Sequence, residues 1–245
     1  MEISFTMLKT FMACEYSYYL RYVKRVKLEE SAASVYGTAI HHTIKLAYEN
    51  SLSKEDMVKV FKNEWITLAG NKNIVFNHDK EYLQKLNDGQ KMVSTYFDKY
   101  IKGVAAPKSI EIFIGRKDGV QLGGYNCIGV FDQIDANNNI IDYKSGVKPT
   151  QVQLDFDLQF TIYSYMYRQL YGEEENSLIL RHLGTMKDLV TVRTEEDFAL
   201  LSKEVGKIDR KIKDGYFVRN LSRDCARCFF MEHCLGKERV FGRRW

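Results

Sequence analysis

A hairpin pattern near the middle of the chain constrains the fold most. Residues 124–135, "GYNCIGVFDQID", and residues 139–145, "NIIDYKS", alternate or run apolar between turn residues, as β-strands do. The "DANNN" segment that joins them is rich in turn residues, so we expect the two strands to form a β-hairpin. A turn near Asn137 would place Asp132 opposite Asp142.

The second strand of this hairpin also carries Lys144, two positions after Asp142. Strand side chains alternate between faces, so we expect both residues to lie on the same face as Asp132. Asp135 is the alternative acid, but it lies beside the turn and faces the other way, so Asp132 is preferred. Two neighbouring carboxylates repel each other unless a cation lies between them, which favours a divalent metal such as Mg²⁺.

The lysine has a chemical use beside such a metal, although a lone D-x-K pair is more typical of an exposed strand end. An ammonium group can help to hold the attacking water as hydroxide, and it can stabilise the charge that develops on a phosphate oxygen. Both effects suit phosphodiester hydrolysis. Asp132, Asp142 and Lys144 are therefore candidate catalytic residues.

The rest of the chain predicts helices around a short sheet. Helices are expected at residues 4–12, 15–26, 34–50, 53–69, 79–102, 154–172 and 198–212, and further strands at 109–116, 176–185 and 188–194. Helices on both sides of a short central sheet indicate an α/β or α+β domain. The 245 residues contain two prolines and no Pro/Gly-rich linker, so we expect one domain over residues 1–245.

The composition excludes several classes of protein. A hydrophobic fraction of 45% supports a sizeable core rather than disorder. No apolar run approaches the roughly 18 residues of a membrane span, and the N-terminus lacks a signal-peptide pattern, so we expect a cytoplasmic protein. The net charge of +4 permits a nucleic-acid partner. Basic clusters at Lys24, Arg25 and Lys27 and at Arg243 and Arg244 suit phosphates.

The five cysteines are distributed unevenly. Cys225, Cys228 and Cys234 lie close together in "CARCFFMEHC", whereas Cys14 and Cys127 stand alone. Disulfides are not expected in a chain without an export signal, so the trio indicates a metal or cluster site. Its C-x₂-C-x₅-C spacing suits zinc as well as an iron–sulfur cluster. Cys127 is interpreted as a buried strand thiol.

The hairpin sequence "GVFDQID…IIDYKSG" resembles the core of the PD-(D/E)XK nuclease superfamily, in its RecB-like branch. The resemblance implies a restriction-endonuclease-like core, in which a short central mixed sheet is flanked by helices. It makes Asp132 the first acid, Asp142 the second acid and Lys144 the lysine. The second acid is Asp here, where many members carry Glu, and both residues occur in the family.

Two helical motifs of that branch are also present. The "GTAIH" segment matches its upstream G-x-x-x-H motif, so the resemblance makes His41 a metal ligand, while His42 faces elsewhere. The implied ligands of Mn²⁺ or Mg²⁺ are then His41, Asp132, Asp142 and the backbone carbonyl of Tyr143. An imidazole ligand favours Mn²⁺, because Mg²⁺ prefers oxygen ligands.

Downstream, Gln159 and Tyr163 match the helical Q-x-x-x-Y motif of the branch. The two residues are one helical turn apart and share a face. The resemblance implies that they brace Lys144 or contact DNA. Glu111 lies where some members have another acid, and it is kept as a further candidate.

The cysteines match the cluster-bearing members of the branch, which include the CRISPR-associated Cas-four exonucleases and the AddB nuclease domain. These members place one cysteine before the nuclease core and three after it as C-x₂-C-x₅-C, an order that Cys14, Cys225, Cys228 and Cys234 reproduce. Four thiolates are the usual ligands of a [4Fe–4S] cluster, which the resemblance implies in preference to zinc. Residues 1–30 and 215–245 would then form a cluster lobe that joins the two ends of the chain.

The resemblance implies a metal-dependent DNA exonuclease that acts on single-stranded DNA or DNA ends. DNA repair, recombination and CRISPR spacer acquisition, with the partner proteins of such a pathway, would all suit this chain. The alternative is a non-catalytic DNA-binding or complex-forming protein that has kept the fold and binds zinc through its cysteines. An RNA-processing protein with a structural zinc ion is a third possibility, which has no support beyond the cysteines. The complete set of two acids and a lysine favours the enzyme, because a binding module has no need for it.

Overall fold

The computed structural model of the chain describes residues 2–70 and 74–236. The predicted basic cluster at Arg243 and Arg244 lies outside the described residues. The described residues form two compact units, one from the segments 1–29, 115–129 and 194–245 and the other from the segments 30–114 and 130–193. Within the described residues, no helix is long and apolar enough to cross a membrane.

The second unit, from segments 30–114 and 130–193, is built on a five-stranded mixed sheet with the order β10-β9-β8-β7-β4. The strands are β4 (Ser109–Ile114), β7 (Gly129–Ile134), β8 (Asn139–Lys144), β9 (Ser177–His182) and β10 (Lys187–Thr191). β8 pairs in parallel with β9, whereas β7–β8 and β9–β10 pair antiparallel. The prediction of an α/β fold with a short mixed sheet flanked by helices is confirmed.

The predicted hairpin is also confirmed, because β7 and β8 pair antiparallel. The paired residues are Gln133 with Ile141 and Ile134 with Ile140. This register is centred on Asn137, as the turn chemistry predicts, and it places Asp132 across from Asp142. The backbone conformation at Asn138 has a φ of +63°, which asparagine tolerates better than most residues.

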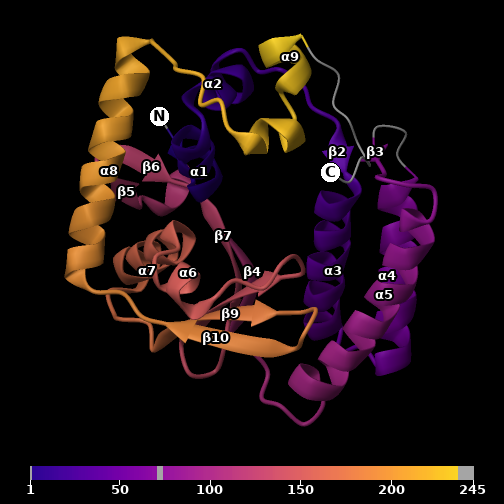
Figure 1. The fold of residues 1–245 in the computed structure, drawn as a ribbon. Coiled ribbons are helices and arrows are strands. Elements are labelled where there is room, and N and C mark those ends of the chain that lie inside the picture. The colour runs from indigo at the N-terminus through magenta and orange to yellow at the C-terminus, as the bar shows by residue number, and fades with distance from the viewer. Residues whose placement is uncertain (1, 71–73, 237–245) are drawn as a thin grey trace. The chain divides into compact units, whose positions relative to one another are not determined.

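Helices supply the rest of this unit (Figure 1). They are α3 (Ala32–Glu49), α4 (Lys54–Ala69), α5 (Glu81–Tyr96), the π-helix η2 (Phe97–Ile101), α6 (Gln151–Asp155) and α7 (Leu158–Tyr171), and a short sheet joins β2 (Glu30–Ser31) to β3 (Ile74–Val75). Ser31 and Ser53 cap α3 and α4 through their side-chain oxygens. The helix predicted over 79–102 changes to π geometry for its last turn.

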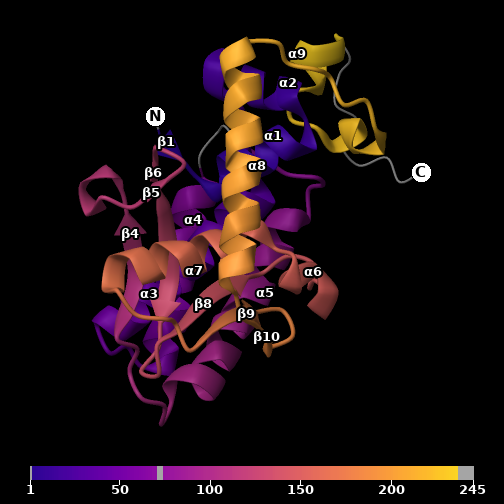
Figure 2. The same ribbon diagram turned by 90° about the vertical axis from the view of Figure 1, so that its left-hand side faces the viewer.

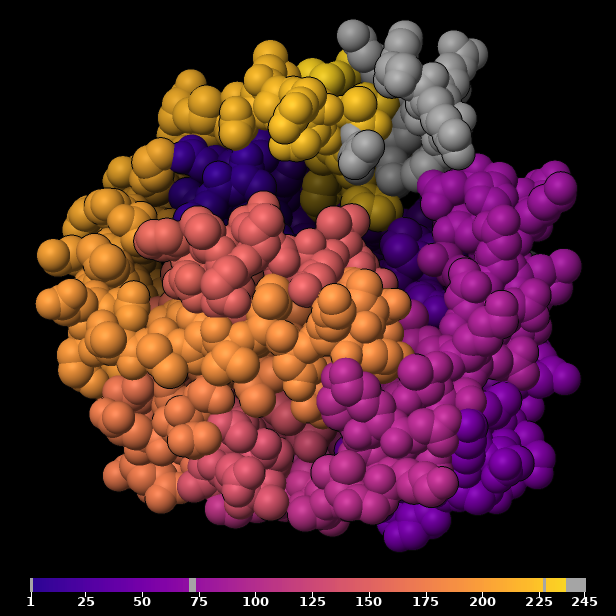
Figure 3. All heavy atoms as spheres, turned by 60° about the horizontal axis from the view of Figure 1, so that its bottom comes forward, coloured from indigo at the N-terminus to yellow at the C-terminus, as the bar shows by residue number. Residues whose placement is uncertain are grey.

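Close packing joins α3, α4 and α5, which lie side by side in Figure 1. A methyl group added at Gly89 of α5 would lie 1.9 Å from the Phe61 ring of α4, so only glycine fits at this contact. Their core includes the fully buried side chains of Ile40, Ile44 and Trp65. Further along the chain, α6 lies beside β10, and the Gln151 side chain donates a hydrogen bond to a β10 carbonyl. In Figure 3, the salmon surface of residues near 150 lies against the orange surface of residues near 190.

The first unit, from segments 1–29, 115–129 and 194–245, contains a small sheet with the order β1-β6-β5 and several helices. Its elements are β1 (Glu2–Ile3), α1 (Phe5–Ala13), α2 (Glu15–Tyr18), the π-helix η1 (Tyr19–Val23), η3 (Arg116–Asp118), β5 (Gln121–Leu122), β6 (Tyr125–Cys127), α8 (Glu195–Asp214), η4 (Arg223–Arg227) and α9 (Met231–Leu235). Ser4 caps α1 as the sequence predicts. Figure 2 shows α8 as one long helix, and Gly215 ends it in the left-handed conformation.

Two sequence predictions differ from the structure in this unit. The single strand expected over 124–135 is divided into β6 and β7, because β6 pairs with β5 and β1 in the small sheet instead of continuing the hairpin. The helix expected over 15–26 is α2 followed by η1. The predicted single domain and the cluster lobe of residues 1–30 and 215–245 stay predictions.

Candidate active site and cysteine-lined cavity

Two buried carboxylates form the centre of the candidate site, and both come from the β7–β8 hairpin. Asp132 is 7% exposed and Asp142 is 1% exposed. Asp132 Oδ2 accepts a hydrogen bond of 2.7 Å from the backbone N–H of Tyr143. Asp132 is thereby fixed to the strand that carries Asp142, although two buried carboxylates repel each other.

His41 of α3 contacts the first of these acids. Its Nδ1 atom lies 3.1 Å from Asp132 Oδ1, and its ring packs edge-on against the ring of Tyr143. Burial alone would lower the pKa of His41, but the carboxylates of Asp132 and Asp142 together outweigh burial and raise it. The neighbouring residue His42 points elsewhere, because its Nδ1 lies 2.9 Å from Glu64 Oε2.

Asp142 and Lys144 share one face of β8, as their spacing predicts. Lys144 Nζ lies 2.7 Å from Asp142 Oδ2, so the lysine forms an ion pair with the buried acid. Burial, opposed by Lys144 and supported by Asp132, raises the pKa of Asp142 to about 6. Burial lowers the pKa of Lys144, but Asp142 outweighs this effect and raises it.

The side chain of Gln159 connects these two residues. Its Nε2 atom donates to Asp142 Oδ1 at 2.9 Å, and its Oε1 atom accepts from Lys144 Nζ at 3.0 Å. Gln159 Nε2 also donates to the hydroxyl of Tyr163 at 2.8 Å, one turn further along α7. Asp157 caps α7 by accepting from Gln159 N–H, so the helix start places this glutamine at the site.

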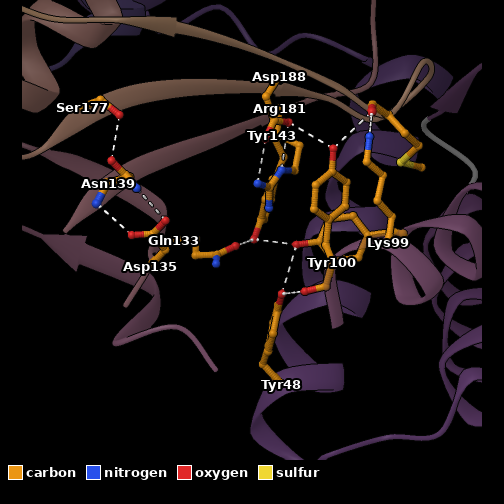
Figure 4. A network of polar contacts seen from close by, with 12 residues as sticks. Tyr48, Lys99, Tyr100, Gln133, Asp135, Asn139, Tyr143, Ser177, Arg181 and Asp188 are labelled. Atoms are coloured by element: carbon orange, nitrogen blue, oxygen red, sulfur yellow. Dashed lines mark hydrogen bonds and ion pairs between the residues drawn. The ribbon is translucent and has the colours of Figure 1, made fainter. Parts of the chain in front are cut away.

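Two other acids have different partners. Asp135 accepts hydrogen bonds from the backbone N–H groups of Asn137 and Asn139 and from the Asn139 side chain, so it organises the hairpin turn (Figure 4). Glu111 Oε2 lies 2.9 Å from Lys45 Nζ. Glu111 also has a φ of +49°, which is unusual for a residue other than glycine.

The donor set at the site fits a divalent cation. Among the described residues, the structure contains no group of three or more His, Cys, Asp or Glu side chains that could hold a metal ion. The two acids instead contact side chains of the chain itself, Asp132 the imidazole of His41 and Asp142 the ammonium of Lys144. Two adjacent buried carboxylates are nevertheless the kind of ligands that a divalent cation between them would stabilise.

Comparison with known proteins agrees with this geometry. Residues 2–235 match the family described as the PD-(D/E)XK nuclease superfamily. The chain belongs to this superfamily. PD-(D/E)XK nucleases generally use divalent metals such as Mg²⁺ or Mn²⁺, in keeping with the two acids.

A solved structure resembles most of the chain. It is a crystal structure from Eubacterium rectale that carries the name "putative exonuclease". It superposes with a TM-score of 0.59 at 18% sequence identity, over 92% of this chain and 87% of that chain. At this identity the likeness concerns the fold. Comparison with curated proteins gives no match.

The first unit holds the four cysteines that the superfamily resemblance singled out. Cys14, Cys225, Cys228 and Cys234 all line one cavity of about 400 Å³. Backbone N–H groups lie 3.4–3.5 Å from three of the sulfur atoms, from Asn220 to Cys14, from Ser222 to Cys225 and from Phe230 to Cys228. Hydrogen bonds of this kind support thiolate ligands in clusters.

The thiol pKa values of Cys14 and Cys234 are affected by hydrogen bonds and neighbouring groups as well as by burial, whereas that of Cys127 is affected by burial alone. Burial opposes ionisation of Cys14, but hydrogen bonds from Asn220 N–H and from Ser17 outweigh it and lower the pKa of Cys14. Burial, with Cys14 and Cys228 nearby, raises the pKa of Cys234. Cys127 is buried in β6, and burial raises its pKa to about 11.

Some residues that organise the site were not identified from the sequence. The Tyr143 side chain donates to Gln133 Oε1 on the face of the hairpin opposite the acids. His182 of β9 donates through Nε2 to the carbonyl of Gly146, just after Lys144. Gln133 could have been noticed, because a polar side chain in an apolar strand needs a partner. His182 and its partner are distant in sequence and carry no local signal.

Proposed function

We propose that the chain is a divalent-metal-dependent deoxyribonuclease. The observation that supports this proposal best is the convergence of the buried acids Asp132 and Asp142 with Lys144, whose Nζ lies 2.7 Å from Asp142 Oδ2. A binding module would gain nothing from two buried acids that repel each other. A nuclease needs them to hold a cation beside the scissile phosphate.

The proposed ligands are His41, Asp132, Asp142 and the backbone carbonyl of Tyr143. A divalent cation held there would supply a Lewis acid for the phosphate and would lower the pKa of water. For it to bind, His41 must release its contact with Asp132 Oδ1 and be neutral. The imidazole favours Mn²⁺ over Mg²⁺.

Lys144 and Gln159 have separate roles in this proposal. Lys144 stabilises the attacking water and the charge that develops on the phosphate oxygens. Gln159 holds Lys144 Nζ and Asp142 Oδ1 at the same time, so it fixes the ammonium relative to the acid. Tyr163 orients Gln159 through its hydroxyl. Glu111, which pairs with Lys45, is a further acid with no assigned step.

We propose an exonuclease that acts on single-stranded DNA or DNA ends. The motifs of the RecB-like branch support this choice, as does the name of the Eubacterium rectale protein with the same fold. DNA repair, recombination and CRISPR spacer acquisition are the pathways that such an enzyme, with its partner proteins, would serve.

The test is a degradation assay with end-labelled linear and circular single-stranded DNA in Mn²⁺ or Mg²⁺. We expect short products from the linear strand only, and none after chelation or with Asp142→Asn. Because asparagine keeps the size of the aspartate side chain, this variant should still bind DNA in a fluorescence anisotropy assay. Binding without cleavage by the wild type would instead support the non-catalytic alternative.

We also propose that Cys14, Cys225, Cys228 and Cys234 hold a structural [4Fe–4S] cluster. The supporting observations are the shared cavity and the N–H groups directed at three sulfur atoms. Iron and acid-labile sulfide analysis of protein purified without air tests this proposal. Four iron atoms per chain are expected, whereas one zinc per chain would favour zinc.

A further inference from the structure

Figure 4 shows a polar network that includes Gln133 and Tyr143. Because strand side chains alternate between faces, these two residues lie on the face of the β7–β8 hairpin opposite Asp132 and Asp142. The centre of the network is Tyr143, which lies between Asp142 and Lys144 in sequence and is 2% exposed. The Tyr143 hydroxyl donates to Gln133 Oε1 and accepts from the Tyr96 hydroxyl at 3.1 Å. Gln133 directly follows Asp132, so the Gln133–Tyr143 contact joins the strands of both acids.

The same network reaches the helix that carries His41. The hydroxyl oxygens of Tyr96 and Tyr48 lie 3.4 Å apart, and Tyr48 belongs to α3, two turns after His41. Tyr48 in turn donates to the Tyr100 carbonyl at 3.1 Å. The elements that carry His41, Asp132 and Asp142 are therefore linked through side chains that do not belong to the site.

These links matter because the backbone does not hold the strands together at the acids. Backbone pairing between β7 and β8 among the described residues ends at Gln133–Ile141, one residue before Asp132 and Asp142. Beyond this pair, the Tyr143 N–H bonds the Asp132 carboxylate instead. The contacts of Tyr143 therefore contribute to the separation of the two repelling acids, beside those of His41 with Asp132 and of Gln159 with Asp142.

We propose that Tyr143 and Gln133 are positioning residues that fix the distance between Asp132 and Asp142. The expected effect on Mn²⁺ binding rests on the proposed metal-dependent hydrolysis. The expected effect on the distance between the two acids does not. Loss of a partner that orients a metal ligand typically weakens metal binding by about 10- to 100-fold. Without the Tyr143 hydroxyl, the site should therefore bind Mn²⁺ more weakly.

The test uses Tyr143→Phe in the full chain, with Tyr167→Phe as the matched control. Tyr167 is also 2% exposed, and its hydroxyl donates to the exposed carboxylate of Glu173 at 3.0 Å, so the control removes a tyrosine hydroxyl and its hydrogen bond away from the site. The first readout is hydrogen exchange of the amide at position 143 in metal-free protein. We expect exchange about fivefold faster or more in Tyr143→Phe, and unchanged in the control.

The second readout is Mn²⁺ binding by calorimetry, where we expect the dissociation constant to rise about tenfold or more in Tyr143→Phe alone. If both readouts match the wild type, the positioning role is overturned. If the wild type binds no Mn²⁺, the proposed metal site fails, and hydrogen exchange still decides whether Tyr143 positions Asp132.

A double variant separates positioning from stability. Tyr143→Phe with Gln133→Met removes both groups of the Tyr143–Gln133 hydrogen bond, so no buried amide oxygen is left without a donor. The melting temperature should recover in part, because the Tyr96 hydroxyl still loses its acceptor on Tyr143. We expect faster exchange and weak Mn²⁺ binding to persist, because the link between the strands is still missing. If amide exchange and Mn²⁺ affinity recovered together with the melting temperature, Tyr143 would contribute to stability alone.

Discussion

Lys144 Nζ lies 2.7 Å from Asp142 Oδ2 and forms an ion pair with this buried acid. The same ammonium donates a hydrogen bond of 3.0 Å to Gln159 Oε1, and Gln159 Nε2 donates to Asp142 Oδ1. The ammonium group is therefore held beside the acid both by charge and by a neutral amide that contacts both residues.

Substitution of Lys144 should affect the chemical step rather than DNA binding. We expect Lys144→Ala to lower kcat by about a hundredfold or more with little change in KM, because one preorganised charge is lost in the transition state. The control is Lys59→Ala, which removes an exposed lysine paired with Asp56. Steady-state kinetics on single-stranded DNA provide the measurement, and a change in KM alone would show that Lys144 only docks the substrate.

Substitution of Asp135 should affect stability rather than activity. Asp135 accepts three hydrogen bonds within the hairpin turn, so we expect Asp135→Ala to lower the free energy of unfolding by about 1–3 kcal/mol. The folded fraction should keep kcat close to that of the wild type. Urea unfolding measures the stability, and steady-state kinetics on the same preparation measure kcat. Loss of activity in folded protein would indicate that Asp135, rather than Asp132, is the first acid of the site.

The hairpin and its acids could be predicted from the sequence because their determinants are local. The turn residues centre the register on Asn137, and strand alternation then determines which side chains face each other. The strand division at residues 127–129 could not be predicted. It depends on the parallel pairing of Glu2 with Asn126, which are far apart in sequence and leave no periodic signal.

The same limit applies to the candidate site. The spacing of Gln159 and Tyr163 predicts a shared helix face, and the structure shows the hydrogen bond between them. The contact of Tyr143 with Tyr96 depends on how α5 packs against the sheet. Such tertiary contacts cannot be read from local patterns.

Thiol labelling should distinguish Cys127 from the other four cysteines. Burial raises the pKa of Cys127 to about 11, and the residue is 1% exposed, so its reactive thiolate is scarce at pH 8. We expect iodoacetamide to modify four cysteines of folded protein stripped of metal, and the fifth only after unfolding. Mass spectrometry of peptides identifies the sites. Rapid labelling of Cys127 in folded protein would contradict this assignment.

Loss of Cys14 should remove the cluster and destabilise the protein. A link between Cys14 and the trio closes a long loop, and such cross-links are expected to stabilise a fold by several kcal/mol, typically about 2–4. We expect Cys14→Ala to lose its iron and to melt earlier, while the soluble fraction keeps some cleavage activity. Cys127→Ala serves as the control that keeps its iron. An unchanged melting curve for Cys14→Ala would contradict the structural role.

Anomalous diffraction from crystals soaked in Mn²⁺ tests the central claim most directly, because it locates the cation without reference to activity. We expect the strongest manganese peak within about 2.5 Å of carboxylate oxygens from both Asp132 and Asp142, with His41 turned from Asp132 toward the ion. The same map from Asp142→Asn crystals should lack this peak. A wild-type map with no manganese between the two acids, and with His41 still on Asp132, would contradict the account.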